Sequence, residues 1–369
     1  MQIREIIKTI EKFAPPKIAW EKDNVGLQVG NPTQRVAKIF LTLDLTSHSL
    51  EEAKKNKCNL IITHHPLIFS PIKKLNFEKD SKSQLIRELI RNEISCYSAH
   101  TNFDFTKDGI SFQLAAKLGL SSIDFLKRSS GTKYKLVTFV PEEYTDKVLS
   151  ALFASGAGII GEYSNCSFQN SGVGSFYGSE KSNPKVGLKG NFEKVKESRI
   201  EVVFDSWNLN EVEKSLVASH PYETPAYDIY KLENANDHFG FGAVGEFPRG
   251  ISVKNFLSLI KKELRLNNFR YTPGKSKLIK KVAVCGGSGI ELLDFAIKTQ
   301  CDAFVTADIK YHDFQEAENR ILLVDAGHFE TEIVGMEFLY KLLKEKLKEE
   351  NIDIIFNKKS TSPIKFFNN

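Results

Sequence analysis

The stretch Cys58-Asn59-Leu60-Ile61-Ile62-Thr63-His64-His65-Pro66 joins a short apolar run to two adjacent histidines and a proline. The run Cys58–Thr63 has the length and composition of a buried strand, and Pro66 prevents further strand pairing. Because ligands gather at the carboxyl ends of strands in open α/β sheets, His64 and His65 are candidate metal ligands. A pair of hydrogen-bonded structural histidines explains this segment equally well.

Strand-like and helix-like segments alternate around this stretch and again after about residue 250. The strand-like runs are Ala37–Leu45, Cys58–Thr63, Ile94–Ser98, Lys281–Cys285, Ala303–Thr306 and Ile321–Asp325. The helix-like segments are Met1–Phe13, Ser49–Asn56, Ser81–Arg91, Glu291–Lys298, Asp313–Asn319 and Thr331–Glu349. This alternation predicts an α/β core with a largely parallel sheet.

The middle of the chain has the order strand, helix, strand, strand, helix, strand. The expected strands are Tyr134–Val140, Gly158–Gln169, Gly172–Tyr177 and Arg199–Phe204, and the expected helices are Tyr144–Ser155 and Leu209–Ser219. The order βαββαβ predicts a small ferredoxin-like α+β domain inserted into a discontinuous core. The expected domains are residues 1–130 and 237–369, the two lobes of the core, and residues 131–236, the insert.

Composition narrows the class of protein. The 369 residues suggest two or three domains, and the net charge of +5, from 51 basic and 46 acidic residues, argues against a nucleic-acid partner. No segment approaches the roughly 20 apolar residues of a spanning helix, so no membrane partner is expected. Five scattered cysteines without a CxxC pair argue against a disulfide framework or a thiolate zinc site. We therefore expect a cytoplasmic protein.

Two further segments place candidate ligands after strands. Asp104 ends the segment Ser98–Asp104, where it can supply a carboxylate ligand or simply form a turn or cap a helix. His328 and Glu332 lie four residues apart across a strand-to-helix junction and can point into one cleft, although a glutamate at a helix start is also ordinary. With the histidine pair they make five ligands, which suits a two-metal hydrolytic site completed by water or substrate.

Weaker signals have ordinary explanations as well. The run Gly286–Gly289 is either a phosphate-binding turn or, more simply, a tight turn capped by Ser288. Thr306–His312 offers Asp308, Lys310 and His312 as candidate catalytic acid/base or phosphate-contacting groups, or it is a solvated loop. The proline-rich His220–Tyr227 reads better as a structured turn than as a second metal site.

The motifs together resemble the NIF-three-like family, whose members are described as GTP cyclohydrolase I type 2 homologues. The resemblance rests on Asp23-Asn24-Val25-Gly26-Leu27-Gln28-Val29-Gly30, Thr63-His64-His65-Pro66, His100-Thr101-Asn102-Phe103-Asp104, Asp308-Ile309-Lys310-Tyr311-His312 and Gly327-His328-Phe329-Glu330-Thr331-Glu332. It implies a dinuclear site with the same five ligands and Glu332 as the bridge. It also implies a PII/CutA-like insert and a toroidal homohexamer.

The expected function is that of a metal-dependent hydrolase acting on a nucleotide or another phosphorylated or cyclic small molecule. The expected cofactor is two divalent ions per subunit, and histidine with carboxylate ligands suits Zn, Fe, Mn, Co and Ni alike. The alternative is a non-enzymatic metal-handling or regulatory hexameric scaffold with a PII-like sensing insert.

Overall fold

The computed structural model describes residues 1–161, 163–182 and 184–367, and the chain divides into two compact units. Unit 1 comprises Met1–Lys127 together with the chain from Phe239 onward, and unit 2 is Arg128–His238. Unit 1 contains two sheets, one in each lobe, and unit 2 contains one. The mixed α/β class expected from the sequence is confirmed.

The first sheet has the strand order β1-β4-β3-β2-β15. Its strands are β1 (Gly26–Val29), β2 (Lys38–Thr42), β3 (Leu60–Thr63), β4 (Ser95–Ser98) and β15 (Asp353–Phe356). All are parallel to their neighbours except β1, which is antiparallel to β4. All four residues of β3 are buried, as expected for an apolar strand covered on both faces.

Helices cover the first sheet. They are α1 (Ile3–Phe13), η1 (Pro16–Ile18), α2 (Ser47–Lys55), α3 (Ser81–Arg91), α4 (Thr101–Asp104) and η5 (Lys348–Glu350). Helix α1 forms because Ile3, Ile6 and Ile10 recur at helical spacing and are fully buried in the core of this lobe. Helix α3 begins where the Asp80 carboxylate accepts hydrogen bonds from two backbone amides.

The second sheet has the strand order β11-β14-β13-β12-β10-β5. Its strands are β5 (Ser121–Arg128), β10 (Gly240–Ser252), β11 (Arg270–Thr272), β12 (Leu278–Ser288), β13 (Ala303–Ala307) and β14 (Leu322–Asp325). The accompanying helices are α5 (Ile110–Lys117), α8 (Val253–Glu263), η4 (Ile290–Leu292), α9 (Leu293–Lys298) and α10 (Tyr311–Ala317). Strands β12, β13 and β14 are parallel, whereas β10 and β11 flank them in the antiparallel sense. The sequence indicated the parallel centre but not these antiparallel flanks.

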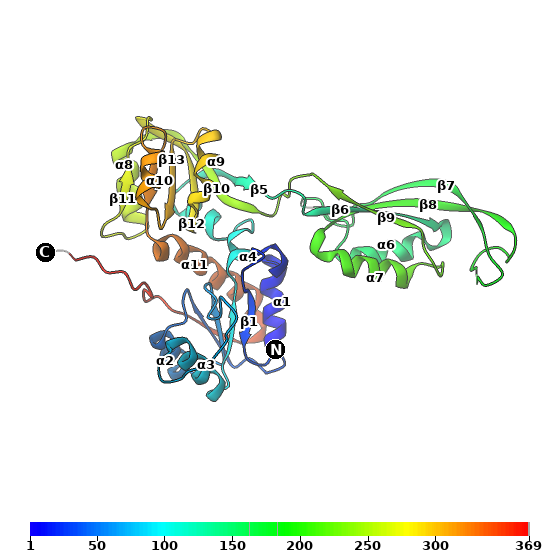
Figure 1. Ribbon diagram of the computed structural model, residues 1–369, viewed down its shortest axis with the longest axis horizontal. Helices are drawn as coiled ribbons and strands as arrows, with labels where there is room; N and C mark the ends of the chain where they lie inside the picture. The colour runs from blue at the N-terminus through cyan, green and yellow to red at the C-terminus, as the bar shows by residue number, and fades with distance from the viewer. Residues whose placement is uncertain (162, 183, 368–369) are drawn as a thin grey trace. The chain divides into compact units, whose positions relative to one another are not determined.

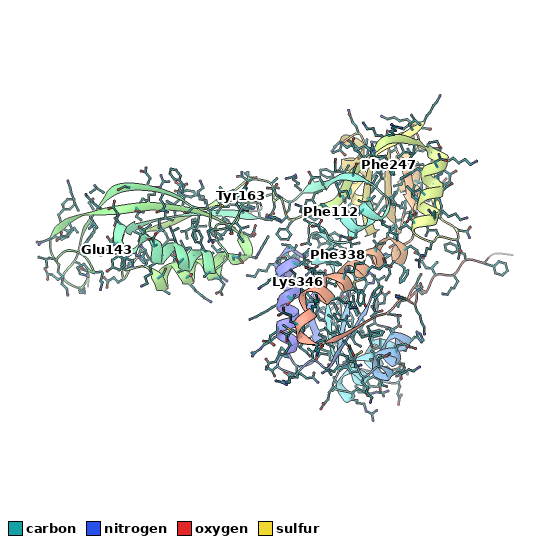
Figure 2. All side chains as sticks on the ribbon, turned by 180° about the vertical axis from the view of Figure 1, so that it is seen from behind. Phe112, Glu143, Tyr163, Phe247, Phe338 and Lys346 are labelled. Atoms are coloured by element: carbon teal, nitrogen blue, oxygen red, sulfur yellow. The ribbon has the colours of Figure 1, made fainter. Side chains whose placement is uncertain are left out.

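Helix α11 (His328–Lys346) belongs to both lobes and lies between the two sheets (Figure 1). Val334, in its second turn, is part of the second lobe's core, whereas Met336, Leu339 and Leu343 are part of the first lobe's core. Phe338, labelled on this helix in Figure 2, packs against Phe13 of α1 with ring centroids 5.6 Å apart. The helix therefore fixes one lobe of unit 1 to the other.

Unit 2 is a four-stranded antiparallel sheet with two α-helices and two short 3-10 helices among its described residues, in the strand order β7-β8-β6-β9. Its strands are β6 (Lys133–Pro141), β7 (Phe168–Tyr177), β8 (Phe192–Asp205) and β9 (Tyr227–Leu232). Its helices are η2 (Glu142–Tyr144), α6 (Thr145–Ala154), η3 (Ser206–Asn208) and α7 (Leu209–Ser219). The order along the chain is βαββαβ.

The predicted strand pair Gly158–Gln169 and Gly172–Tyr177 is wrong. The two segments contribute to one strand, β7, which begins at Phe168 and pairs with β8. Most of the segment before Phe168 is not a strand, because Gly158 and Gly161 adopt positive φ angles of 79° and 56° that interrupt pairing. Residue 162 of this segment lies outside the described residues. Among the described residues, no helix combines the length and the apolar character needed to cross a membrane.

Candidate metal centre

Five side chains named from the sequence come together in unit 1, where several strands of its two sheets end. His64 and His65 follow β3 directly, and Asp104 ends the short helix α4 after β4. His328 and Glu332 lie in the first two turns of α11, after β14. The carboxyl ends of parallel strands thus supply ligands from both lobes, as expected for an α/β fold.

The distances within this cluster are those of groups that face one another. The Nε2 atoms of His65 and His328 are 3.1 Å apart. The Glu332 carboxylate lies between them, with Oε2 3.1 Å from His65 Nε2 and Oε1 3.0 Å from His328 Nε2. His64 Nε2 is 3.7 Å from Glu332 Oε1 and 3.6 Å from Asp104 Oδ1. Each oxygen of Glu332 therefore faces a different histidine.

The first lobe fixes its histidines through their Nδ1 atoms. His64 Nδ1 lies 2.8 Å from the carbonyl oxygen of Ala99, and His65 Nδ1 lies 2.7 Å from Asp44 Oδ1. An oxygen acceptor at Nδ1 places the proton there and leaves the lone pair of a neutral imidazole on Nε2, which faces the cluster. The Thr361 hydroxyl also donates a hydrogen bond to Asp44.

The second lobe fixes His328 in the same way, through Asp308. The Asp308 Oδ2 atom lies 2.6 Å from His328 Nδ1. Close approach also requires glycine at 287, since a Cβ there would lie only 2.1 Å from Glu332 Oε1 and 3.3 Å from His328 Nε2. Gly287 further has a positive φ of 61°. This glycine therefore makes room for the glutamate.

Three buried atoms of the cluster have no hydrogen-bond partner among the described residues. They are His64 Nε2, Asp104 Oδ1 and Glu332 Oε2; the last lies 3.1 Å from His65 Nε2 but without the geometry of a hydrogen bond. An unpartnered buried polar or charged group is costly, so such groups are normally paired or bound to a metal. Imidazole nitrogens and carboxylate oxygens are the donors that divalent transition metals take, so this residue set fits such ions.

The environment shifts the pKa of each member of the cluster. Burial lowers the pKa of His64 to about 4. The carboxylates of Asp44 and Glu332 outweigh burial at His65 and raise its pKa to about 10, while Glu332 and Asp308 likewise raise the pKa of His328 to about 9. Burial and the negative charge of Glu332 raise the pKa of Asp104. The two carboxylates therefore compete, and bound cations would relieve the conflict.

His100 lies beside this cluster. Ligand nitrogens of His64, His65 and His100 lie within 4.8 Å of one another, as do the ligand atoms of His65, His328 and Glu332. His100 Nδ1 is held 2.9 Å from both oxygens of Asp23, which also accepts a hydrogen bond from Thr101. These hydrogen bonds outweigh burial and lower the pKa of Asp23 to about 2. In the sequence, His100 stands out only as part of the motif His100–Asp104.

Two of the predicted catalytic groups do not contact the cluster, and two residues that support the cluster were not predicted. Of the three candidate catalytic groups, Asp308 bonds His328, whereas Lys310 is exposed and His312 bonds Gln315 at 3.0 Å. Asp44 was missed because the expected strand Ala37–Leu45 included it, whereas β2 ends at Thr42 and leaves Asp44 just after the strand. No comparable signal in the sequence marks Thr361.

A cavity of about 130 Å³ adjoins the cluster. Asp104, His328 and Glu332 line it together with Trp20 and Ser288. In the glycine run, Gly286 to Ser288 end β12 and Gly289 is the N-cap of η4, so the run joins a strand to a helix. The expected cap by Ser288 is wrong, because no side chain caps η4. The cavity gives a small molecule access to the cluster.

The chain is similar to known proteins over nearly its whole length. The model of the family described as Duf34/NIF3 (NGG1p interacting factor 3) matches residues 1–363. Relatives from Halalkalibacterium halodurans and Bacillus subtilis, both named GTP cyclohydrolase 1 type 2 homolog, are each 34% identical over 98% of this chain and 98% of their own. The solved Bacillus cereus protein related to NIF3 is 34% identical, with a TM-score of 0.86 over 100% of this chain and 99% of that one.

Proposed function

Because the chain belongs to the Duf34/NIF3 family, we propose that it is a dinuclear metal-dependent hydrolase acting on a nucleotide or a related small molecule. The proposed ligands of the two ions are His64, His65, Asp104, His328 and Glu332. Their nitrogen and oxygen donors suit Zn, Fe, Mn, Co or Ni. The names of the relatives, GTP cyclohydrolase 1 type 2 homolog, make GTP the first substrate to test.

The observation that carries this proposal is the set of three buried, unpartnered atoms on His64, Asp104 and Glu332. They belong to elements far apart in the chain, and each is aimed at the same space. Glu332 suits a bridge between two ions, since its two oxygens face different histidines. Divalent ions held there would polarise a substrate oxygen and lower the pKa of water, the chemistry of two-metal hydrolases.

Other residues of the chain would orient the metal ligands. Asp44 and Asp308 hold the rings of His65 and His328, which keeps their Nε2 atoms directed at the cluster. The adjoining cavity of about 130 Å³ is smaller than the roughly 300–1,000 Å³ of a typical ligand pocket. It therefore fits the reacting part of a substrate, with the remainder outside.

Elemental analysis followed by a rate measurement tests the proposal. Wild-type protein reloaded with Zn, Mn, Fe, Co or Ni should hold about two ions per chain and hydrolyse GTP or another nucleotide. The double variant Asp104→Ala, Glu332→Ala should lose both properties. Two bound ions with the wild-type rate retained in the double variant would refute the mechanism, and little metal under all loading conditions would refute the site.

A second function is supported by unit 2, which has its own core and cavity apart from the cluster. Under this view the protein is a metal-handling or regulatory scaffold, a cytoplasmic homohexamer in which unit 2 is a PII/CutA-like sensing domain. Its βαββαβ order supports the PII/CutA-like assignment. Metal binding without turnover of any nucleotide, with a hexamer by analytical ultracentrifugation, would favour the scaffold.

A further inference from the structure

Unit 2 contains a cavity of about 620 Å³ that the metal chemistry does not use. Its volume lies within the range of pockets that enclose small organic molecules. Its walls are formed by strands β6, β7 and β8, by the segment between α7 and β9, and by described residues of the connection between β7 and β8. Its lining includes Phe139, Gly174, Phe176, Glu197, Arg199 and Tyr222.

The cavity lies on the face of the sheet opposite the helices. Along β8, Ile200 and Val202 belong to the core that packs on α6 and α7. Successive side chains of a strand point to opposite faces, so Glu197 and Arg199 point away from that core. Phe139 is paired with Arg199 across β6 and β8 and shares the same face. The cavity is therefore separate from the packing that holds unit 2 together.

Glu197 is the unusual residue of this wall. It is only 8% exposed, whereas the other charged lining residues, Lys185, Arg199 and Glu223, are exposed. Its Oε1 atom accepts a hydrogen bond of 2.7 Å from the Tyr222 hydroxyl. Across the part of the chain that the structure describes, no cation lies within ion-pair distance of this carboxylate, and Arg199 is paired with Glu201 instead.

Room for the Glu197 carboxylate depends on glycine. A Cβ at Gly174 would lie 1.9 Å from Glu197 Oε2, so any larger residue on β7 would displace the carboxylate. Burying most of a carboxylate without a cation beside it is costly. The Oε2 atom is not among the fully enclosed atoms that lack a partner, so it opens to the cavity. The free oxygen therefore offers a site for a positively charged group that enters the cavity.

The aromatic residues that line the cavity favour a ligand with an aromatic ring. The rings of Phe176 and Tyr222 are in edge-to-face contact with centroids 6.2 Å apart, and Phe139 lines the same space. Burial and the bond to Glu197 raise the pKa of Tyr222, so the phenol stays protonated and keeps donating to Oε1. Aromatic faces also attract cations directly.

We propose that unit 2 binds a small aromatic molecule carrying a protonated amine or amidine, with the cation at Glu197 and the ring among Phe139, Phe176 and Tyr222. This site does not depend on the metal cluster.

The test uses the full chain and three cationic probes: tryptamine, tyramine and benzamidine. Saturation-transfer NMR detects their binding, and competition titrations give the affinities. Tryptophol is the uncharged analogue of tryptamine. Its affinity should be lower by roughly tenfold or more, because a charge-assisted hydrogen bond contributes at least about 1.5 kcal/mol. Failure of all three cations to bind, or equal binding of tryptamine and tryptophol, would overturn the proposal.

Variants locate the site. Glu197→Gln keeps the shape but removes the charge, so it should weaken tryptamine binding roughly tenfold or more. Gly174→Ala should also weaken binding by displacing the carboxylate, with circular dichroism to check the fold. Glu211→Gln is the matched control, because that exposed glutamate on α7 lies outside the cavity and pairs with Lys214. Equal affinity in Glu197→Gln and wild type, or an equal loss in Glu211→Gln, would contradict the assignment.

Discussion

The two lobes of unit 1 orient their histidines by the same kind of contact but in different surroundings. In the first lobe, His65 is held by Asp44, whose side chain is 32% exposed and which also accepts a hydrogen bond from Thr361. In the second lobe, His328 is held by Asp308, whose side chain is 47% exposed. A carboxylate shielded from water interacts more strongly with its partner than an exposed one. We therefore expect the first lobe to hold its imidazole more firmly.

Glu332 is the residue that the two lobes share, and its loss should have the largest effect. Glu332→Ala removes the carboxylate between His65 and His328, so the metal content should fall from about two ions per chain to nearly none. Inductively coupled plasma mass spectrometry measures this ratio. Glu337→Ala, an exposed position on the same helix, is the control and should keep its metal. Retention of both ions without Glu332 would show that the lobes bind metal separately.

The pH dependence of metal binding should reveal one protonated imidazole in each lobe. In the metal-free protein His65 and His328 have pKa values of about 10 and 9, above the ordinary 6.5, so both are protonated at pH 7. Metal must displace these protons, and the affinity should therefore rise with pH, approaching tenfold per pH unit for each proton released. His64, with a pKa of about 4, should release none.

Calorimetry in two buffers of different ionisation enthalpy counts the protons released. At pH 7 we expect about two from the imidazoles, plus any from Asp104, whose pKa is also raised. In His328→Ala one fewer proton should be released. An unchanged count in that variant would mean that the second lobe contributes no protonated imidazole.

Asp44→Asn should weaken metal binding by roughly tenfold to a hundredfold, the usual effect of losing a carboxylate that orients a histidine ligand. The amide can still accept the His65 proton, so the ring position should be kept while the charge is lost. A competition titration with a chromogenic chelator measures the affinity. Asp146→Asn, an exposed position on α6 in unit 2, is the matched control. Wild-type metal affinity in Asp44→Asn would contradict the expectation that the first lobe holds its imidazole more firmly.

Asp308→Asn should have the smallest effect of the series, a loss of roughly tenfold or less, because solvent screens this more exposed carboxylate. The same chelator titration applies. If exposure sets the strength of these contacts, the loss of metal affinity in Asp308→Asn should be smaller than the loss in Asp44→Asn. The reverse order would show that exposure does not set the strength of these contacts.

Much of this arrangement could be predicted from local sequence. Helix α3 was predicted with its observed bounds, Ser81–Arg91, because charge density and the spacing of apolar residues are local signals. Strand β3 and the five candidate ligands that follow strands could also be predicted, since an apolar run followed by polar groups is visible in the sequence. The family was identified from the same motifs and is confirmed by the comparisons.

The remainder depends on contacts between distant segments. Gly287 was visible as part of a glycine run, but its role comes from its distance to Glu332, which only the folded chain defines. Thr361 reaches Asp44 across 317 positions of sequence, a contact that no local pattern encodes. Likewise, glycines in Gly158–Gly161 and inside β7 look alike in sequence but adopt different backbone conformations.

The parallel pairing of β15 with β2 has a consequence for the order in which the protein folds during synthesis. Asn357, just after β15, donates a hydrogen bond to Thr42, 315 positions earlier. On the ribosome, β2 therefore keeps an open edge until β15 has been made. Unit 2, contiguous from Arg128 to His238, can fold during this delay. The sheet that contains β2 is thus completed only after β15 has been made, and until then its apolar strands need protection from aggregation.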